Sequence, residues 1–456
     1  MKASNNIWLK HPAGIFTGGA TNSDDASNGI VVGNKKIVEL VGKGKEPKTA
    51  ITQVIDCRAF AITPGLINIH HHFYQTLTRC VPEALNKPLF PWLKSLYQVW
   101  KNLDADMLES ATKLAALELM MSGATTVCDH HYVFPNGLEN AIDIQVSALQ
   151  LLGCRAVLTR GSMSLGEKDG GLPPDTVIQN EDTILLDSER VVSAFHQTHE
   201  GAMMQIALAP CSPFSVSTQL MKDTASLAKS LNVLLHTHLG ETEDEDAFCV
   251  RQFGMRPVDY LASCGWLEER TWLAHAIHFT PEEIVRLGKA KVGIAHCPSS
   301  NMLLASGICP TLDLVKAGCK VGLAVDGSAS NDSSNMIQEV RQSLLQQRLK
   351  YGAEAITAKT VLDYATKGAA NVLARPDIGE IAVGMQADLA FFNLDALRFS
   401  GVGDPIAALV QCGAHTVGKL MVAGDWIIEN GHHKNIDPMD LMAQHQAFAR
   451  KLQFAR

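Results

Sequence analysis

Paired cysteines are missing from this sequence of 456 residues. Its 11 cysteines stand singly, without regular spacing and without a CxxC motif. An odd number of cysteines at irregular spacing argues against a disulfide framework and against a zinc ribbon, because both need cysteines in pairs. We therefore expect reduced thiols and a cytoplasmic protein.

Long apolar runs and clusters of positive charge are also missing. No apolar stretch is long enough to span a bilayer, and the N-terminal segment MKASNNIWLKHPAGIF lacks the apolar core of a secretory signal. The 39 Lys and Arg residues are outnumbered by 47 Asp and Glu residues, which gives a net charge of -8. We expect neither a nucleic acid nor a membrane as a partner.

Several hydrolase signatures are absent as well. HExxH and GxSxG do not occur, which argues against zincin proteases and serine hydrolases. The segment PCSPF at 210–214 lacks the second cysteine of the PCxxC signature that cytidine-type zinc deaminases carry. The residues that carry chemistry must therefore be sought in other patterns.

Eight short apolar segments recur between longer segments of helical character, such as 104–123 and 217–231. With 46% apolar and 19% charged residues, the chain can form a large buried core. Alternating strands and helices indicate parallel strands, and eight such units predict an α/β fold with a closed (β/α)₈ barrel of the TIM type. The expected strands lie at 65–70, 124–130, 154–159, 204–210, 233–238, 272–277, 292–298 and 321–327.

The two ends of the chain have a different pattern. GIVVGNKKIVELV (29–41) and QVIDCRAFAI (53–62) are typical of hairpin strands around Gly and Asn turns, and 388–395 and 419–431 are again strand-like. We expect a small β-sandwich domain formed by both termini, from residues 1–64 and 379–456, beside a barrel at 65–378. The last segment, 437–456, is expected to be helical.

Polar residues follow several of the expected strands at the carboxyl end, where a barrel of this kind carries its active site. His70 and His72 follow the first strand, His238 ends the fifth and Asp326 ends the eighth. Residues two apart in a strand face the same way, so His70 and His72 point together while His71 points elsewhere. Three imidazoles and one carboxylate suit zinc, or iron if the site opens to five-coordination.

Each of these residues also has an ordinary structural interpretation. An isolated HxH pair is more often incidental, a buried histidine often only satisfies hydrogen bonds, and an Asp before Gly is a common turn former. The metal hypothesis depends on their joint occurrence at the strand ends of one barrel. We expect His71 to lie outside the ligand set.

The sequence resembles the amidohydrolase superfamily, in its deaminase and chlorohydrolase branch, through segments that cover nearly the whole chain in order. These are PGLINIHHHFYQ, GATTVCDH, HTHLGET, AHAIHFT, AHCPSSNMLLASGICP and VGLAVDGSASND. The resemblance implies a distorted barrel with a β domain made from both ends. It places one divalent metal, Zn²⁺ or Fe²⁺, on His70, His72, His238 and Asp326. The strand at 204–210 ends without the lysine that would bridge two metals.

The resemblance also implies a set of proton-handling residues, Glu241, His275 and Asp326. Glu241 would carry a proton to a ring nitrogen and then to the leaving amine, although alone it could be a first-turn acid of a helix. Asp326 and His275 would accept the proton that the attacking water loses. We expect His278 to support His275 from behind.

A narrower resemblance, to 8-oxoguanine deaminases, depends on HHHFYQTLTRCVPEALNKPLFPWLKSLY, DHHYVFPNG and VDGSASND. It implies a small heterocyclic substrate and water, with urate and ammonia as products. Gln75, Trp92 and Arg160 are candidate substrate contacts. Each has an ordinary alternative, which for Trp92 is a core aromatic and for Arg160 a salt bridge.

Other functions share the same metal core. Guanine, an isocytosine-like ring, S-adenosylhomocysteine or adenosine, or an amino- or chlorotriazine could be the substrate. A catalytically dead scaffold is the alternative of another class, although the complete set of ligands and proton handlers argues against it. A homo-oligomer is expected from the barrel class alone.

Overall fold

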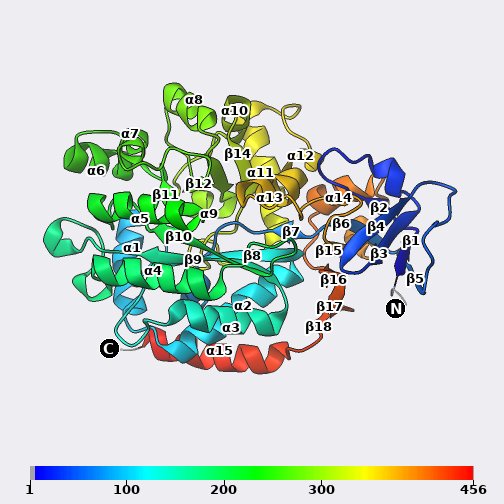
Figure 1. The fold of residues 1–456 in the computed structure, drawn as a ribbon, viewed down its shortest axis with the longest axis horizontal. Helices are drawn as coiled ribbons and strands as arrows, with labels where there is room; N and C mark the ends of the chain where they lie inside the picture. Colours follow the sequence, from blue (N-terminus) through cyan, green and yellow to red (C-terminus); the bar gives the residue numbers. More distant parts are fainter. Residues whose placement is uncertain (1–5, 455–456) are drawn as a thin grey trace.

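In the computed structural model, which describes residues 6–454, eight parallel strands form one sheet in sequential order (Figure 1). Each lies within or beside one of the eight predicted segments, so the predicted barrel strands are confirmed. The strands are β7 (Leu66–Ile67), β8 (Ala124–His131), β9 (Arg155–Ser162), β10 (Met204–Pro210), β11 (Leu235–Leu239), β12 (Thr271–His275), β13 (Gly293–His296) and β14 (Lys320–Leu323).

The first and last strands of this sheet come together to close the barrel. The backbone N–H of Ile69 donates to the carbonyl of Leu323 at 3.3 Å, and the N–H of Asp326 donates to the carbonyl of His70 at 3.2 Å. In each bond at least one residue lies beyond the end of β7 or β14. The two strands therefore close the barrel without forming a regular ladder. The distorted (β/α)₈ barrel expected from the sequence is confirmed.

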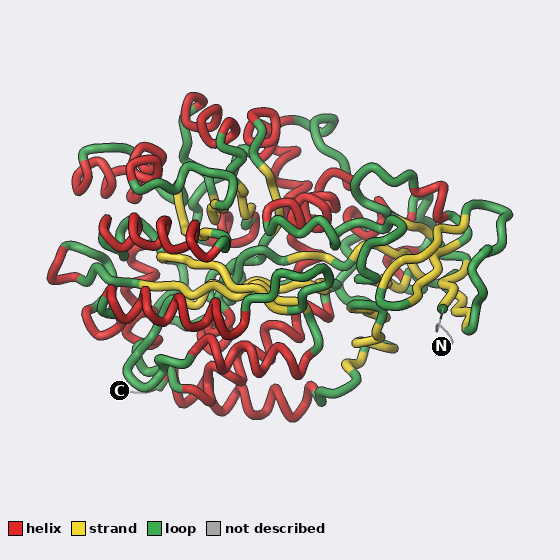
Figure 2. Tube along the Cα trace, viewed as in Figure 1, coloured by secondary structure: helices red, strands yellow, loops and turns green. Residues whose placement is uncertain are grey.

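At least one helix follows each barrel strand, and the helices surround the strands (Figure 2). The helices predicted at 104–123 and 217–231 are confirmed; their N-caps, Asp104 and Ser217, accept backbone N–H bonds from Met107 and Leu220. The helices are α1 (Leu89–Trp100), α2 (Ala105–Met121), α3 (Ala141–Leu152), α4 (Glu181–Phe195), α5 (Thr218–Leu231), α6 (Glu243–Phe253), α7 (Pro257–Ser263), α8 (Pro281–Lys289), α9 (Pro298–Leu303), α10 (Thr311–Ala317), α11 (Met336–Tyr351), α12 (Ala358–Asp363) and α13 (Ala369–Val372).

Two further sheets lie beside the barrel, at the right of Figure 1. One has the strand order β4 (Lys36–Val41), β3 (Gly29–Gly33), β1 (Ile7–Lys10), β5 (Gln53–Asp56). The other has the order β18 (His432–His433), β17 (Asp425–Glu429), β16 (Lys419–Val422), β15 (Leu389–Asn393), β6 (Phe60–Pro64), β2 (Gly14–Ile15). Because β6 pairs antiparallel with β15, both ends of the chain build the second sheet, as predicted.

The hairpin prediction for the N-terminal segments is only half right. β3 and β4 form the expected hairpin, in which Asn34 and Lys35 adopt positive φ angles of 51° and 70°, as a two-residue turn requires. The segment 53–62 is not a hairpin. β5 pairs with β1 in the first sheet and β6 pairs with β15 in the second, so the turn between them passes the chain from one sheet to the other.

The two sheets pack face to face as a sandwich. One apolar cluster joins side chains of the first sheet (Ile7, Leu9, Ile30 and Val32) to side chains of the second (Ile62, Leu389, Phe391 and Met421). The β sandwich is therefore confirmed, whereas the domain boundaries at residues 64 and 378 stay predictions.

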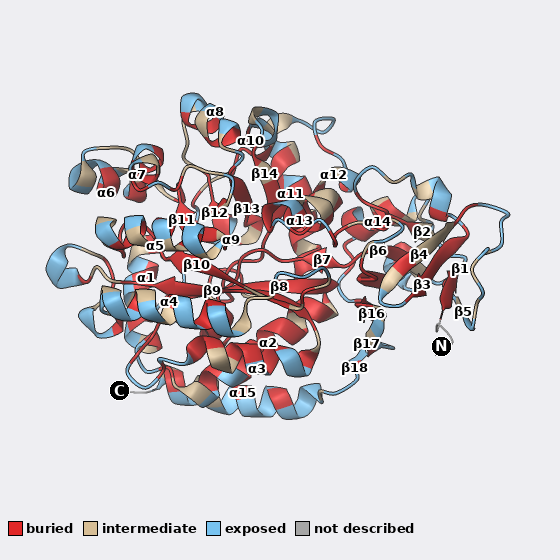
Figure 3. Ribbon diagram, viewed as in Figure 1, coloured by how far each residue is buried: buried red, intermediate tan, exposed pale blue. Residues whose placement is uncertain are grey.

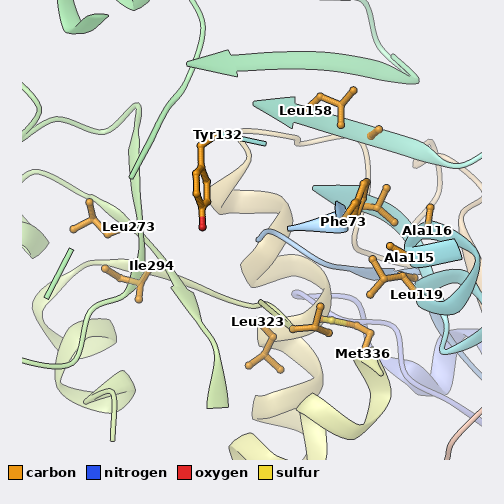
Figure 4. Packing of buried hydrophobic residues seen from close by; sticks show 14 of the residues in the cluster. Phe73, Ala115, Ala116, Leu119, Tyr132, Leu158, Leu273, Ile294, Leu323 and Met336 are labelled. Atoms are coloured by element: carbon orange, nitrogen blue, oxygen red, sulfur yellow. The ribbon is translucent and has the colours of Figure 1, made fainter. Parts of the chain in front are cut away.

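Side chains of the barrel strands face two separate cores. In β9, Val157 belongs to the cluster inside the barrel, while Leu158 belongs to the cluster between strands and helices. Figure 4 shows part of the second cluster, with Leu158 and Leu273 on barrel strands and Leu119 on α2. The strands are accordingly buried on both sides, and exposed residues gather on the outer faces of the helices (Figure 3).

A buried ion pair connects the barrel to the terminal sheet. Arg155 of β9 lies 2.5 Å from Asp388, which directly precedes β15, and its guanidinium also donates to the carbonyl of Gly201 at 2.7 Å. A second oxygen of Asp388 accepts the backbone N–H of Ala423 at 2.7 Å. The pair thus fixes the position of the sheet against the barrel.

The C-terminal segment is helical, as expected from the sequence. After α14 (Pro405–Gln411) and the last strands, α15 (Pro438–Gln453) lies along α2 (Figure 1). The final two residues of the predicted helix, 455–456, lie outside the described residues. Over residues 6–454, no helix combines the length and the apolar character that crossing a membrane requires.

Candidate metal centre and the pocket around it

The predicted ligands all lie at the carboxyl end of the barrel and are buried. His70 and His72 follow β7, His238 lies in β11, and Asp326 follows β14. The Nε2 atoms of His72 and His238 are 3.2 Å apart. Asp326 Oδ1 is 3.2 Å from His70 Nε2 and 3.3 Å from His72 Nε2. The structure therefore brings all four side chains to one point.

His71 points away from this point, as its position in the triplet predicts. Its Nδ1 accepts the backbone N–H of His72 at 2.7 Å, and its ring packs edge-on against Phe73. His71 is thus a buried structural neighbour of the cluster.

The hydrogen bonds of His72 and His238 fix which ring nitrogen is free. His72 Nδ1 is 2.8 Å from the carbonyl oxygen of His130, and His238 Nδ1 is 2.7 Å from that of Cys211. A carbonyl can only accept, so each Nδ1 carries the proton and each Nε2 presents a lone pair. Burial lowers the pKa of His238 to about 3, which keeps its ring neutral.

The free ring nitrogen of His70 is identified in the same way, from its hydrogen bond to another histidine. His236 Nδ1 donates to the carbonyl of Trp272 at 2.9 Å, so His236 Nε2 is an acceptor. It accepts from His70 Nδ1 at 2.7 Å, which leaves a lone pair on His70 Nε2. That atom is buried and has no hydrogen-bond partner among the described residues. Three lone pairs and one carboxylate on a common point form a donor set that fits zinc.

Asp326 is held by its own hydrogen bonds. Its Oδ2 accepts the hydroxyls of Ser300 at 2.6 Å and Ser330 at 3.2 Å, and its Oδ1 accepts the backbone N–H of Gly327 at 2.7 Å. Its φ angle is 64°, and that of His275 is 72°. Such left-handed conformations cost energy for a residue with a side chain and persist only where the surroundings enforce them.

Glu241 and His275 lie next to the ligand set. His275 Nε2 is 3.4 Å from Glu241 Oε2 and 3.9 Å from Asp326 Oδ2. His275 Nδ1 is 2.9 Å from Asn301 Oδ1, which leaves Nε2 free to accept a proton. Burial, and then the charge of Asp326, raises the pKa of Glu241 well above its ordinary value. Glu241 therefore favours the protonated form, as a proton donor must.

The structure corrects the expectation for His278. Its Nε2 is 2.7 Å from the carbonyl oxygen of Ser306, and no hydrogen bond joins it to His275 within the described residues. Asn301 takes the place behind His275 instead. The turn after β12 carries His278 outward, and Arg256 donates to its carbonyl oxygen at 3.2 Å.

The backbone of Glu241 is anchored by another buried carboxylate. Glu245, on the first turn of α6, accepts the N–H of Gly240 at 2.8 Å and that of Glu241 at 3.2 Å. Glu245 has no solvent exposure, and burial raises its pKa to about 8. It fixes the segment that carries the proton donor.

A pocket opens beside the ligands. Gln75 and Trp92 line it, and both are fixed to Ala329: the indole N–H of Trp92 donates to its carbonyl at 3.1 Å, and Gln75 Oε1 accepts its N–H at 3.3 Å. The pocket walls are His72, Gln75, Leu89, Trp92, Leu93, Tyr97, Tyr132, Cys211, Phe214, His238, Glu241, His275, Leu304, Asp326 and Ser330.

Arg160, the third candidate substrate contact, lies elsewhere. It is two residues after Leu158 in β9 and faces outward in the same way, toward α4, where its Nε is 2.5 Å from Asp187. Its guanidinium also donates to Gln179 at 2.9 Å and lies over the ring of Phe134. The structure therefore places Arg160 in the layer of helices, away from the pocket lining.

The sequence reasoning missed several residues of the site. Tyr132 and Cys211 follow β8 and β10, and this strand-end position was a signal that could have identified them. His130 ends the same β8 segment, and one of its ring nitrogens lies within 4.8 Å of those of His70, His72 and His238. Tyr97 belongs to α1, the helix that also carries the predicted contact Trp92, but no sequence pattern singled out Tyr97 itself.

Comparisons with known proteins agree with this geometry. Residues 61–427 match the model of the amidohydrolase family. An 8-oxoguanine deaminase from Pseudomonas aeruginosa is 56% identical over 445 residues, with 98% of each chain covered. Hydroxydechloroatrazine ethylaminohydrolase from Pseudomonas sp. (strain ADP) is 35% identical and covers 88% of this chain and 84% of its own. A crystal structure of atrazine chlorohydrolase from Arthrobacter aurescens TC1 complexed with zinc has a TM-score of 0.90 at 29% identity, with 97% and 100% covered.

Proposed function

Because the chain belongs to the amidohydrolase family, we propose that it hydrolyses 8-oxoguanine to urate and ammonia. One zinc ion would be held by His70, His72, His238 and Asp326. The observation that carries the proposal is the convergence of three imidazole lone pairs and one carboxylate beside Glu241 and His275.

The choice of substrate is supported by similarity. The 8-oxoguanine deaminase from Pseudomonas aeruginosa shares more than half of its residues with this chain over nearly its full length. The triazine hydrolases are more distant in sequence. Their likeness supports a hydrolytic reaction on an aromatic nitrogen heterocycle at the same end of the barrel.

The choice of zinc is supported by the donor set and by the relatives. Two histidines present Nε2 because their Nδ1 atoms donate to carbonyls, and the third because His236 accepts from it. When bound, a zinc ion lowers the pKa of a coordinated water to about 7. The solved atrazine chlorohydrolase structure contains zinc.

The side chains of the site can move every proton that the reaction needs. Asp326 and His275 Nε2 lie 3.9 Å apart and can share the proton that water loses as it attacks the ring carbon bearing the amino group. Glu241 begins protonated and can donate to the ring nitrogen. It then takes up the second proton of the attacking water and passes it to the amine, which leaves as ammonia, and the proton shared by Asp326 and His275 returns to Glu241. Water is consumed, and the ring carbon becomes a carbonyl.

The test is an ammonia-release assay on purified protein reconstituted with one equivalent of zinc. The proposal expects faster release from 8-oxoguanine than from guanine, with urate as the second product at a ratio of one to one. Isocytosine and an aminotriazine complete the panel. Faster turnover of guanine or of the triazine would contradict the proposed substrate.

The cellular setting is proposed from the sequence and the thiols. All 11 cysteines are free, which suits a reducing compartment such as the cytoplasm. A homo-oligomer stays a prediction from the barrel class. Sedimentation velocity on the zinc-loaded protein tests it, and a single species at 49.3 kDa would contradict it.

A further inference from the structure

Helix α1 (Leu89–Trp100) forms one side of the pocket. Leu89, Trp92, Leu93 and Tyr97 line the pocket, and their spacing puts them on one face of the helix. The bond from the Trp92 indole to the carbonyl of Ala329 attaches α1 to the segment that follows Asp326. This bond therefore fixes the position of the helix relative to the metal ligands.

The hydroxyl of Tyr97 has no hydrogen-bond partner in the described part of the chain, although the residue is fully buried. Leaving such a group unpaired is unfavourable, and buried hydroxyls are nearly always bonded. Because Tyr97 also lines the pocket, the missing partner is one that a bound molecule can supply.

The groups around this hydroxyl are neutral. Burial raises the pKa of Tyr97 well above its ordinary value, and the neighbouring Cys211 thiol and Tyr74 hydroxyl raise it further. Burial likewise raises the pKa of Cys211 to about 12. Tyr97 therefore stays an O–H donor at neutral pH, and this side of the pocket suits an uncharged acceptor such as a carbonyl oxygen. The side with Glu241 and Asp326 handles protons.

The proposed reaction fixes how a purine lies between these two sides. The carbon that loses its amino group must be near Glu241, His275 and Asp326, which directs the five-membered ring away from the ligands. In an 8-oxopurine, that ring carries a carbonyl oxygen at the end remote from the amino group. Guanine has a C–H at the same position, which cannot accept a hydrogen bond.

We propose that Tyr97 is the specificity-determining residue for 8-oxopurines, because its hydroxyl donates a hydrogen bond to the oxygen on the five-membered ring. This inference rests on the proposed function and names the feature of the substrate that the pocket selects. A guanine in the same place would leave the Tyr97 hydroxyl unpaired. Sites built to pair a polar group discriminate strongly against analogues that lack the partner.

The test compares wild type and Tyr97→Phe on three substrates: 8-oxoguanine, guanine and isocytosine. The substitution should lower kcat/KM for 8-oxoguanine about 10- to 100-fold, as loss of one buried hydrogen bond predicts. Guanine should be unchanged within about twofold, because it makes no bond to this hydroxyl. Isocytosine lacks the five-membered ring, so unchanged turnover of isocytosine shows that the variant is folded and that its metal site is intact.

Tyr74→Phe is the matched control. Tyr74 also has a fully buried hydroxyl, close to the side chains of Tyr132 and Gln75, but it does not line the pocket itself. Its removal should leave the ratio of 8-oxoguanine to guanine turnover unchanged. An equal loss in the Tyr74 variant would show that removing any buried hydroxyl near the pocket has this effect, and it would overturn the inference.

The outcomes separate this inference from the proposed function. Wild-type preference for 8-oxoguanine with an unchanged ratio in Tyr97→Phe contradicts the role of Tyr97 alone. Equal losses on all three substrates contradict it as well. Wild-type protein that releases ammonia from guanine but not from 8-oxoguanine contradicts both.

Discussion

The Nε2 atoms of His72 and His238 face each other at 3.2 Å, although 166 residues separate them in the chain. Both are lone-pair atoms, because each Nδ1 donates to a carbonyl. Two lone pairs at this distance repel, and a shared cation converts the repulsion into attraction. The packing of the fold therefore holds these two atoms in an arrangement that is favourable only when a positive ion lies between them.

Metal removal should therefore destabilise the protein. Loading with zinc at about a thousand times its dissociation constant stabilises a native state by roughly 4 kcal/mol, so chelation should lower Tm and added zinc should restore it. Thermal unfolding with and without a chelator measures the shift, and elemental analysis should give one zinc per chain. A Tm that is the same with and without the metal would contradict a single tight site.

Asp326→Ala should abolish turnover, with kcat below a tenth of wild type. The substitution removes the only carboxylate of the ligand set and the acceptor of the Ser300 and Ser330 hydroxyls. The same variant should lose the response of Tm to zinc. Retention of more than a tenth of kcat with full metal content would show that the carboxylate is not a ligand.

Glu241→Gln should keep the metal and lose about 10²-fold or more in kcat, as expected when a general acid is removed. The amide preserves the size of the side chain, so KM should change much less than kcat. Metal analysis beside steady-state kinetics distinguishes the two possible roles. A parallel loss of zinc would identify Glu241 as a ligand.

Arg155→Met should destabilise the fold by about 3 to 5 kcal/mol, because it leaves Asp388 as an unpaired buried charge. The double variant Arg155→Met/Asp388→Asn should recover part of that loss, since neither charge then remains. Urea unfolding of the four proteins completes the cycle. Equal destabilisation by the single and double variants would mean that the ion pair does not couple the barrel to the terminal sheet.

The free energy of unfolding should fall in mild acid through His445 of α15. Its Nε2 is 3.0 Å from Thr76 Oγ1, and burial, with a smaller contribution from Arg79, lowers its pKa from 6.5 to about 4. A histidine with a lowered native pKa contributes fully above pH 6.5 and loses its contribution as the pH falls toward 4. At pH 5 the loss is about 2 kcal/mol.

His445→Gln isolates this effect, because the amide can still donate to Thr76 but does not titrate. Its stability should fall less than that of wild type between pH 7.5 and pH 5, by about 2 kcal/mol. Identical pH dependence of the two proteins would show that His445 is not the group responsible.

Much of the fold and the ligand set could be predicted from sequence because both follow from local rules. Continuous apolar runs identified the strands, and the period of two separated His71 from His70 and His72. Strand ends of one barrel meet at one edge, so His238 and Asp326 could be placed beside them.

The remaining residues depend on tertiary placement, which local rules do not supply. Arg160 could not be assigned to the outer face, because its strand is buried on both sides and its sequence shows no regular alternation. The segment 53–62 has two strand-like halves, but no local pattern shows that its turn changes sheets. Tyr97 reaches the pocket only because α1 packs with one face against it.

The pairing of β6 with β15 has a consequence for how the protein is made. About 325 residues lie between these two strands. At a translation rate of about 5 to 20 residues per second, β6 emerges from the ribosome roughly 15 to 65 s before its partner. Throughout that interval its edge is open to pairing with other chains. The yield of this protein should therefore depend on how well β6 is protected while the chain is being made. A chaperone, or slow release of the N-terminal strands from the ribosome, should affect the yield more than the free energy of the folded barrel does.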